Sequence, residues 1–209
     1  MKKLALFLVI VMAVTPIFAV SGYIGGTFAP QFGWYSYKVS SDSGKVLYDQ
    51  DLSETLIVIG ADGATYWGKQ HQFGIGYGFD IGFTVGAKAG DTKLDTSDFG
   101  VTISPNVSFQ YRYLLNKNLA IETGTGFQVD FVKDDFGEKS SISMTTFSLV
   151  ANVDALYNIT DQVGLKGGVS FAIPLGTTGE LETGASTISA NIDRNGFILK
   201  PYFSVGYCY

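Results

Sequence analysis

Side chains alternate between apolar and polar or small along residues 73–85, and this two-residue period constrains the fold more than any other feature. The apolar members are Phe73, Ile75, Tyr77, Phe79, Ile81, Phe83 and Val85, and four of the six residues between them are glycine. Successive side chains of a β-strand point to opposite faces, whereas a helix repeats its apolar positions every three to four residues. The segment is therefore predicted to be a strand with one apolar face.

The same alternation recurs along the chain, and no window favours a helix. It is clear at residues 101–113, 119–131, 147–157, 163–173 and 197–209, and weaker at residues 22–34 and 55–66. Short polar turns are predicted at residues 68–71, 116–118 and 158–161, and long polar loops at residues 35–53, 87–98, 133–141 and 176–195. A unit of two strands, one short turn and one long loop thus repeats about every 45 residues, which predicts eight antiparallel strands in up-and-down order.

The first residues have the layout of a secretory signal peptide. Lys2 and Lys3 give a basic start, residues 4–14 form an unbroken apolar run, and Pro16 interrupts it before the small residue Ala19. The run is shorter than the ~20 apolar residues that a spanning helix needs. Cleavage is predicted between Ala19 and Val20, which leaves residues 20–209 as a single domain.

The number of aromatic residues indicates which face of the strands points outward. The chain has 16 Phe and 12 Tyr, and only 16% of its residues are charged. An eight-stranded barrel has an interior just wide enough for side chains to fill, so the aromatic face would overpack it. The other face carries too few charges for a water-exposed surface. The fold class predicted is an all-β, eight-stranded antiparallel up-and-down transmembrane β-barrel. A soluble secreted barrel is the alternative fold.

Aromatic residues gather where the strands meet the short turns. They are Tyr66, Trp67, Tyr111, Tyr113, Tyr157, Tyr207 and Tyr209. Short turns belong on the periplasmic side of such barrels and long loops on the outer side. The set is therefore predicted to form a periplasmic aromatic girdle at the membrane interface.

Charged residues on the polar face are expected inside the barrel. The predicted lumen charge cluster consists of Asp80, Arg112, Glu122, Asp130, Asp154, Lys166 and Lys200. If the short turns are centred on Asn116 and Thr160, Asp154 faces Lys166, Gln110 faces Glu122, and Arg112 lies diagonal to Glu122. Paired charges could close the lumen, or the many lumenal glycines could leave a polar channel, and both hypotheses stay open.

The chain resembles the small eight-stranded outer-membrane barrels of the OmpA, OmpX and OmpW type. The resemblance rests on the signal peptide, the eight alternating strands and the last segment Phe203-x-Val205-x-Tyr207-x-Tyr209. It implies a location in the outer membrane, contact with its lipid, and recognition of the last strand by the barrel-assembly machinery. It also implies a non-enzymatic protein with a membrane-structural role or one in surface interaction through acidic outer loops. The alternative is a narrow pore for small solutes, porin-like or OmpW-like.

Composition excludes several other classes of function. One Cys and one His rule out a disulfide framework and a multi-histidine metal site, and a net charge of −5 argues against nucleic-acid binding. The acidic residues Asp91, Asp95 and Asp98 lack the spacing of a calcium loop. We therefore expect no catalytic residue, no cofactor and no metal, and a protein that is a monomer with an unidentified surface ligand.

Overall fold

The computed structural model describes residues 21–40, 46–68, 70–135, 140–183 and 186–209. The predicted signal peptide and its cleavage site at Ala19 and Val20 lie outside the described residues. Eight long strands fill most of the described chain: β1 (Ser21–Ser40), β2 (Val46–Trp67), β3 (Phe73–Ala89), β5 (Val101–Leu114), β6 (Leu119–Asp135), β7 (Ser140–Asn158), β8 (Val163–Thr183) and β9 (Ser186–Cys208). Between β3 and β5 lie the two-residue strand β4 (Thr92–Lys93) and the 3-10 turn η2 (Thr96–Asp98). Within these residues, no helix has the length and hydrophobicity to cross a membrane.

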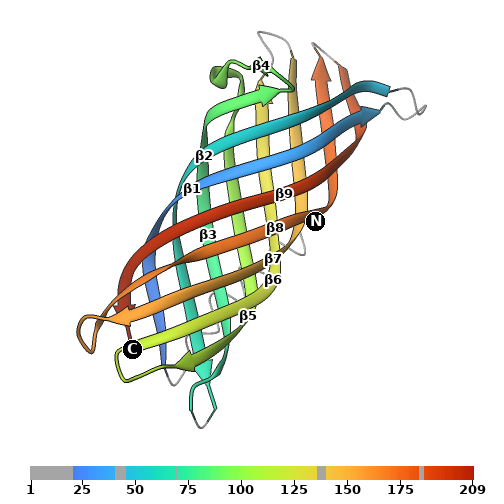
Figure 1. Ribbon diagram of the computed structural model, residues 1–209. Helices are drawn as coiled ribbons and strands as arrows, with labels where there is room; N and C mark the ends of the chain where they lie inside the picture. Colours follow the sequence, from blue (N-terminus) through green and yellow to red (C-terminus); the bar gives the residue numbers. More distant parts are fainter. Residues whose placement is uncertain (1–20, 41–45, 69, 136–139, 184–185) are drawn as a thin grey trace.

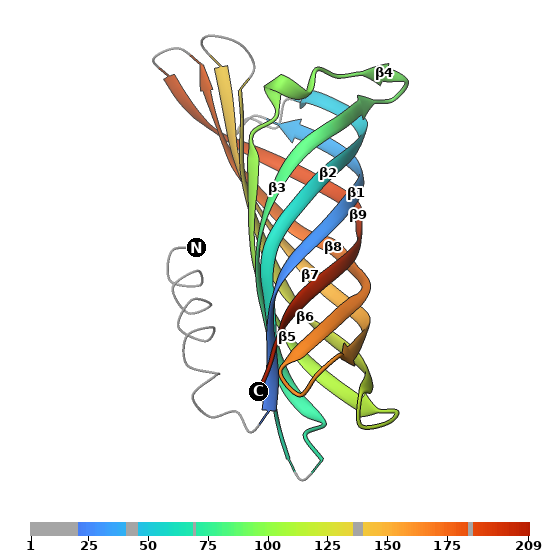
Figure 2. The ribbon, with the colours of Figure 1, turned by 90° about the vertical axis from the view of Figure 1, so that its left-hand side faces the viewer.

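The eight long strands close into one barrel (Figures 1 and 2). Each pairs antiparallel with its neighbours in the chain, and β9 pairs with β1, with Phe28 opposite Phe203. Closure leaves no long strand with an unpaired edge, so the backbone groups are satisfied within the sheet. The predicted eight-stranded antiparallel barrel is confirmed.

The apolar face of the strands points outward. Phe109 is 74% exposed, and the other large apolar side chains that alternate with it along the strands are also exposed, among them Phe28, Phe73, Phe79, Phe83, Phe127, Val153, Phe171, Phe203 and Val205. The opposite face is buried and largely polar, with Gln110, Gln128, Ser148 and Ser204 among its residues. This distribution, apolar outside and polar inside, suits a barrel surrounded by lipid.

The strands run much further at the outer end than the alternation predicts. Residues 35–53 and 176–195 were predicted as long loops, but β1 and β2 pair as far as Ser40 opposite Val46, and β8 and β9 as far as Thr183 opposite Ser186. Residues 133–141 likewise fall mostly in β6 and β7, and the predicted loop at residues 87–98 contains β4 and η2. Above the apolar belt both faces of a strand can be polar, so the period disappears although the pairing continues.

The short turns at Asn116 and Thr160 share one geometry, and it shifts the strand register from the one predicted. The side-chain oxygen of Asn116 accepts hydrogen bonds from the backbone N–H groups of Asn118 and Leu119, at 2.8 and 3.0 Å. Thr160 does the same for Gln162 and Val163, at 3.2 and 3.0 Å. These capped turns are centred one residue later than predicted, so partners across each hairpin shift by two positions.

Two glycines of the barrel wall give a matched test of this inside-out arrangement. A side chain at Gly126, which faces inward, would collide with the backbone of Val107 and Ser108, whereas nothing lies within 4 Å of the same position at Gly26, which faces outward. We expect Gly126→Val to lower the free energy of unfolding by about 1–3 kcal/mol. Gly26→Val should change it by less than about 0.5 kcal/mol. Urea unfolding in lipid vesicles measures both, and equal losses would contradict the assignment of faces.

Candidate functional site: the lumen and its outer mouth

Lys166 on β8 is the centre of a buried ionic cluster at the inner end of the lumen. Its Nζ lies 3.0 Å from Asp62 Oδ2, 3.6 Å from Glu122 Oε2 and 3.7 Å from Asp154 Oδ1. Arg112 donates from Nε to Glu122 Oε1 at 2.8 Å, and its guanidinium lies 3.6 Å from the centroid of the Tyr66 ring. We call Asp62, Arg112, Glu122, Asp154 and Lys166 the inner cluster. It joins β2, β5, β6, β7 and β8 across the lumen.

Asp62 was missed by the sequence analysis although it is central to this cluster. Thr27 and Ser204 each donate to its Oδ1 at 2.6 Å, and Lys166 donates to its Oδ2. Asp62 lies on β2, where the inward residues Leu56 and Val58 are apolar and buried. Because apolar residues occupy both faces of this strand, the period that would have placed Asp62 in the lumen is weak.

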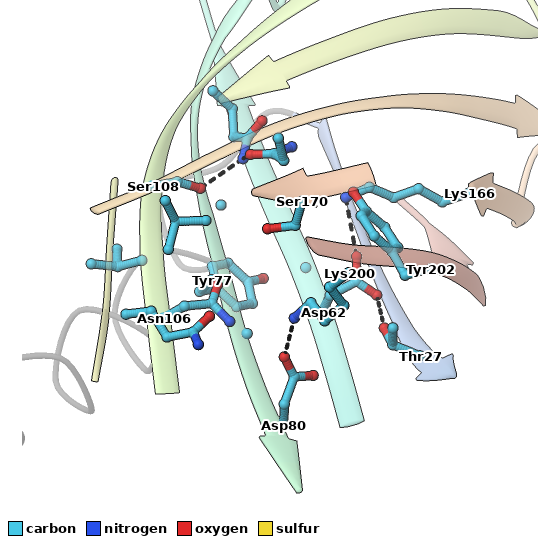
Figure 3. Close-up of a pocket in the computed structure, with 18 residues that line it drawn as sticks. Thr27, Asp62, Tyr77, Asp80, Asn106, Ser108, Lys166, Ser170, Lys200 and Tyr202 are labelled. Atoms are coloured by element: carbon cyan, nitrogen blue, oxygen red, sulfur yellow. Dashed lines mark hydrogen bonds and ion pairs between the residues drawn. The ribbon is translucent and has the colours of Figure 1, made fainter. Parts of the chain in front are cut away.

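The structure places all seven residues of the predicted lumen charge cluster inside the barrel, but not as one group. Arg112, Glu122, Asp154 and Lys166 meet in the inner cluster, whereas Lys200 pairs with Asp80 further along the lumen (Figure 3). Asp130 instead accepts hydrogen bonds from neutral donors, Ser104 Oγ and Gln128 Nε2, both at 2.6 Å.

The pairings predicted within this cluster were wrong by two residues. Asp154 stands opposite Gly168, and Lys166 opposite Leu156, so the two charges meet on the diagonal. Arg112, not Gln110, stands opposite Glu122, and Gln110 stands opposite Gly124. The capped turns at Asn116 and Thr160 account for both shifts.

Tyr66 does not belong to the predicted aromatic girdle. Its side chain is fully buried inside the barrel beneath Arg112, and its neighbour Trp67 points outward instead. Adjacent residues of a strand face opposite ways, so Tyr66 and Trp67 could not both reach lipid. The other members, Trp67, Tyr111, Tyr113, Tyr157, Tyr207 and Tyr209, are exposed on the outer surface near the short-turn end.

The described lumen has little free space between these contacts. One cavity of about 60 Å³ lies between the inner cluster and the Lys200–Asp80 pair, lined by Gly76, Gly78 and Asn106 among others (Figure 3). A second, of about 20 Å³, lies nearer the outer end beside Gln31 and Asp130. Each is the size of one to a few water molecules. Polar side chains thus fill most of the lumen between the inner cluster and the second cavity.

A larger and mainly apolar cavity opens above this section, at the outer mouth. Its volume is about 420 Å³, and we call it the vestibule. Its apolar walls are formed by Tyr37, Val39, Leu52, Leu94, Phe99, Ile142, Met144 and Leu181. The predicted long loops at residues 35–53, 87–98 and 176–195 supply Tyr37, Leu94 and Leu181, which is why the sequence analysis did not predict this cavity.

Arg194, Glu54 and Asp134 form the charged part of the vestibule lining, and Arg194 is held on several sides. Its Nη2 donates to Glu54 Oε2 at 3.3 Å, and Nη1 donates to Thr146 Oγ1 at 3.5 Å. Its guanidinium also lies 3.6 Å from the centroid of the buried Tyr35 ring. The positive charge is therefore paired with Glu54 within the wall, and Asp134 adds a buried carboxyl group to an otherwise apolar lining.

The connection between β3 and β5 covers one side of the vestibule. It is tied to the barrel by backbone N–H groups: Gly90 donates to the carbonyl of Asp51 at 2.9 Å, and Gly100 to Asp134 Oδ1 at 2.9 Å. The exposed Asp95 caps η2, and the hydrogen bond from the Ser97 N–H lowers the pKa of its carboxyl. These bonds hold Leu94 and Phe99 over the mouth.

Comparison with known proteins fits this geometry. The model of the outer membrane protein β-barrel domain matches residues 78–200, which is more than half of the chain. The chain belongs to this family of outer membrane barrels. No curated protein matches it at a significant level.

Solved structures show the same fold at low sequence identity. OprG from Pseudomonas aeruginosa has a TM-score of 0.63 at 14% identity, over 91% of this chain and 96% of that protein. Neisserial surface protein A has a TM-score of 0.51 at 15% identity, over 86% and 96%. A major outer membrane protein from Thermus thermophilus has a TM-score of 0.52 at 13% identity, over 89% and 99%.

Two lysines test the energetic weight of the inner cluster. Lys166→Met removes the charge that Asp62, Glu122 and Asp154 share, and we expect a loss of about 3–5 kcal/mol in the free energy of unfolding. Lys133→Met removes the exposed ion pair with Glu182, at 3.4 Å, and should cost less than about 1 kcal/mol. Denaturant titration in vesicles compares the two variants. Similar losses in the free energy of unfolding would mean that the inner cluster does not stabilise the folded barrel.

Proposed function

We propose that the protein is a closed, non-enzymatic outer-membrane barrel that acts at its outer mouth by binding a small apolar molecule. The observation that carries this proposal is the position of the vestibule, a mainly apolar cavity of about 420 Å³ above a section of lumen whose cavities measure only about 60 and 20 Å³. Cavities of roughly 300–1,000 Å³ with apolar walls and few polar groups are typical of small-ligand sites.

The chemistry of the lining supports an uncharged ligand. Val39, Ile142 and Met144 are buried and pack against one another at the vestibule wall, so a guest there would replace water against apolar surface. Arg194 already has Glu54 as its counter-ion, and Asp134, the other charged residue of the lining, accepts a hydrogen bond from the N–H of Gly100. A charged ligand would gain little from this pair, whereas a small aromatic or aliphatic molecule of the surrounding medium would be desolvated on entry.

The two ends of the barrel differ, and this difference indicates how the protein is oriented in the membrane. The three short turns and the C-terminal end of β9 lie at one end, and β4, η2 and the long strand extensions at the other (Figures 1 and 2). Short turns face the periplasm in barrels of this kind. The vestibule would then open to the outside, after export by the signal peptide and assembly through the last strand.

Surface contacts through the acidic outer residues, and conduction through a narrow pore, are secondary functions in this proposal. Asp49, Asp51 and Glu180 lie on the extended outer ends of β2 and β8, where they are exposed and could contribute to surface contacts. A pore would require the ion pairs of Lys166 and Lys200 to part. The glycines that line the 60 Å³ cavity are the feature that favours such an opening.

Methyl NMR of the protein in lipid nanodiscs, titrated with toluene, tests the proposed site. The methyl signals of Ile142 and Met144 should shift and saturate, because a cavity holds a limited number of guests. The signal of Ile81, which lies on the outward face of β3, should drift in proportion to toluene dissolved in the bilayer. Val39→Trp, which fills the vestibule, should weaken the saturable binding by more than tenfold.

A control variant separates loss of the site from a general effect of an added ring. Val153→Trp places the same side chain on the lipid face, where Val153 is 58% exposed, and should leave the binding unchanged. Unsaturable shifts at Ile142 in the unmodified protein would contradict the proposal, as would equal binding by Val39→Trp.

A further inference from the structure

Two carboxyl groups of the inner cluster face each other directly across neighbouring strands. Glu122 on β6 is the pairing partner of Asp154 on β7, and both side chains point into the lumen. Glu122 is 0% exposed and Asp154 is 3% exposed. Like charges at directly opposed positions repel, and burial away from water strengthens the repulsion.

The charges of the inner cluster do not balance if every group is ionised. Asp62, Glu122 and Asp154 would contribute three negative charges, and Arg112 and Lys166 two positive ones. Lys200 is already paired with Asp80 and does not reach the cluster through any described ion pair. One buried negative charge is therefore left without a counter-ion, which is costly in a closed lumen.

The hydrogen bonds indicate where the imbalance is located. Asp62 accepts from Thr27, Ser204 and Lys166, so both of its oxygens have donors. Glu122 Oε1 accepts from Arg112. Asp154 Oδ2 accepts from Asn152 and Tyr202, at 2.6 and 2.7 Å.

The two remaining oxygens, Glu122 Oε2 and Asp154 Oδ1, have no donor among the described residues. They lie 3.6 and 3.7 Å from Lys166 Nζ, within range of its charge but beyond hydrogen-bonding distance. The side chains of Glu122 and Asp154 occupy directly opposed positions on neighbouring strands, and the Tyr66 hydroxyl also lies close to Glu122. A single proton between the two carboxyl groups would satisfy both oxygens and neutralise the cluster.

We propose that Glu122 and Asp154 form a proton-binding site, in which the two carboxyl groups share one proton at neutral pH. Other titratable or charged groups that face the site come from all sides of the lumen. They are Tyr23 on β1, Asp62 and Tyr66 on β2, Arg112 on β5, Lys166 on β8, and Tyr202 and Cys208 on β9. Both oxygens of Asp62 accept hydrogen bonds, so this carboxyl group is ionised. The proton therefore belongs to the opposed pair, Glu122 and Asp154.

This proton makes the stability of the folded barrel depend on pH. In the unfolded chain both carboxyl groups are ionised above about pH 5, so the folded barrel holds one proton more than the unfolded chain. The site therefore stabilises the barrel at low and neutral pH, and its contribution is lost as the pH rises until the proton dissociates from the folded protein. Over that range the unfolding equilibrium constant increases about tenfold per pH unit because of this site alone.

The test compares the pH dependence of urea unfolding in vesicles between the unmodified protein and Asp154→Asn. The carboxamide donates the hydrogen bond that the proton supplied, and it leaves two negative and two positive charges in the cluster. We expect the pH slope of the logarithm of the unfolding constant to fall by about one unit in the variant. Glu122→Gln should lose the same slope, and it replaces Asp154→Asn if that variant does not refold.

Infrared spectroscopy gives a readout that a merely structural role would not change. At neutral pH the difference spectrum between the unmodified protein and either variant should contain the carbonyl band of a protonated carboxyl group. The double variant Asp80→Asn/Lys200→Gln removes a buried pair that shares no proton, so it should keep both the band and the slope. Equal slopes in all four proteins, or a difference spectrum with only ionised carboxylate bands, would overturn the proposal.

Discussion

Backbone hydrogen bonding determines the architecture of this protein. In hydrocarbon an unpaired N–H or C=O group has no water to bind, so a spanning sheet must close on itself. The pairing of β9 with β1 achieves this and removes the last edges of the sheet. Once the cylinder is closed, the alternation of side chains can only separate them into a lipid-facing set and a lumenal set, and the remaining features follow from that separation.

Closure of a narrow cylinder brings charges from distant parts of the chain into contact. Lys166 meets Asp62, which is 104 residues away, and Lys200 meets Asp80, which is 120 residues away. Because the inner wall excludes most water, each of these groups needs a partner. At the inner end this requirement is met by an ionic cluster, and we infer a shared proton there. At the outer end, where apolar side chains surround Glu54, Asp134 and Arg194, the lumen widens into the vestibule.

The sequence predicts the fold well because one physical rule, alternation between lipid and lumen, acts on most strands. The sequence from Phe73 to Val85 alternates throughout, although Tyr77 is buried, and all seven predicted lumen charges lie inside. The rule fails where its cause is absent. Asp62 lies on a strand with apolar residues on both faces, Tyr66 was assigned by its residue type against the alternation, and Tyr37 and Arg194 lie beyond the apolar belt. The register error between Asp154 and Lys166 has a different source, the side-chain caps of two turns, which alternation does not encode.

Single-channel conductance in planar lipid bilayers tests most directly whether the polar contacts close the lumen. The unmodified protein at neutral pH should give no resolvable current, because the inner cluster and the Lys200–Asp80 pair leave only small cavities between them. The quadruple variant Asp80→Ala/Asp154→Ala/Lys166→Ala/Lys200→Ala, which removes side chains from both the inner cluster and the Lys200–Asp80 pair, should give steady openings. Steady openings of the unmodified protein would show a continuous pore and contradict the account of a closed barrel that acts at its outer mouth.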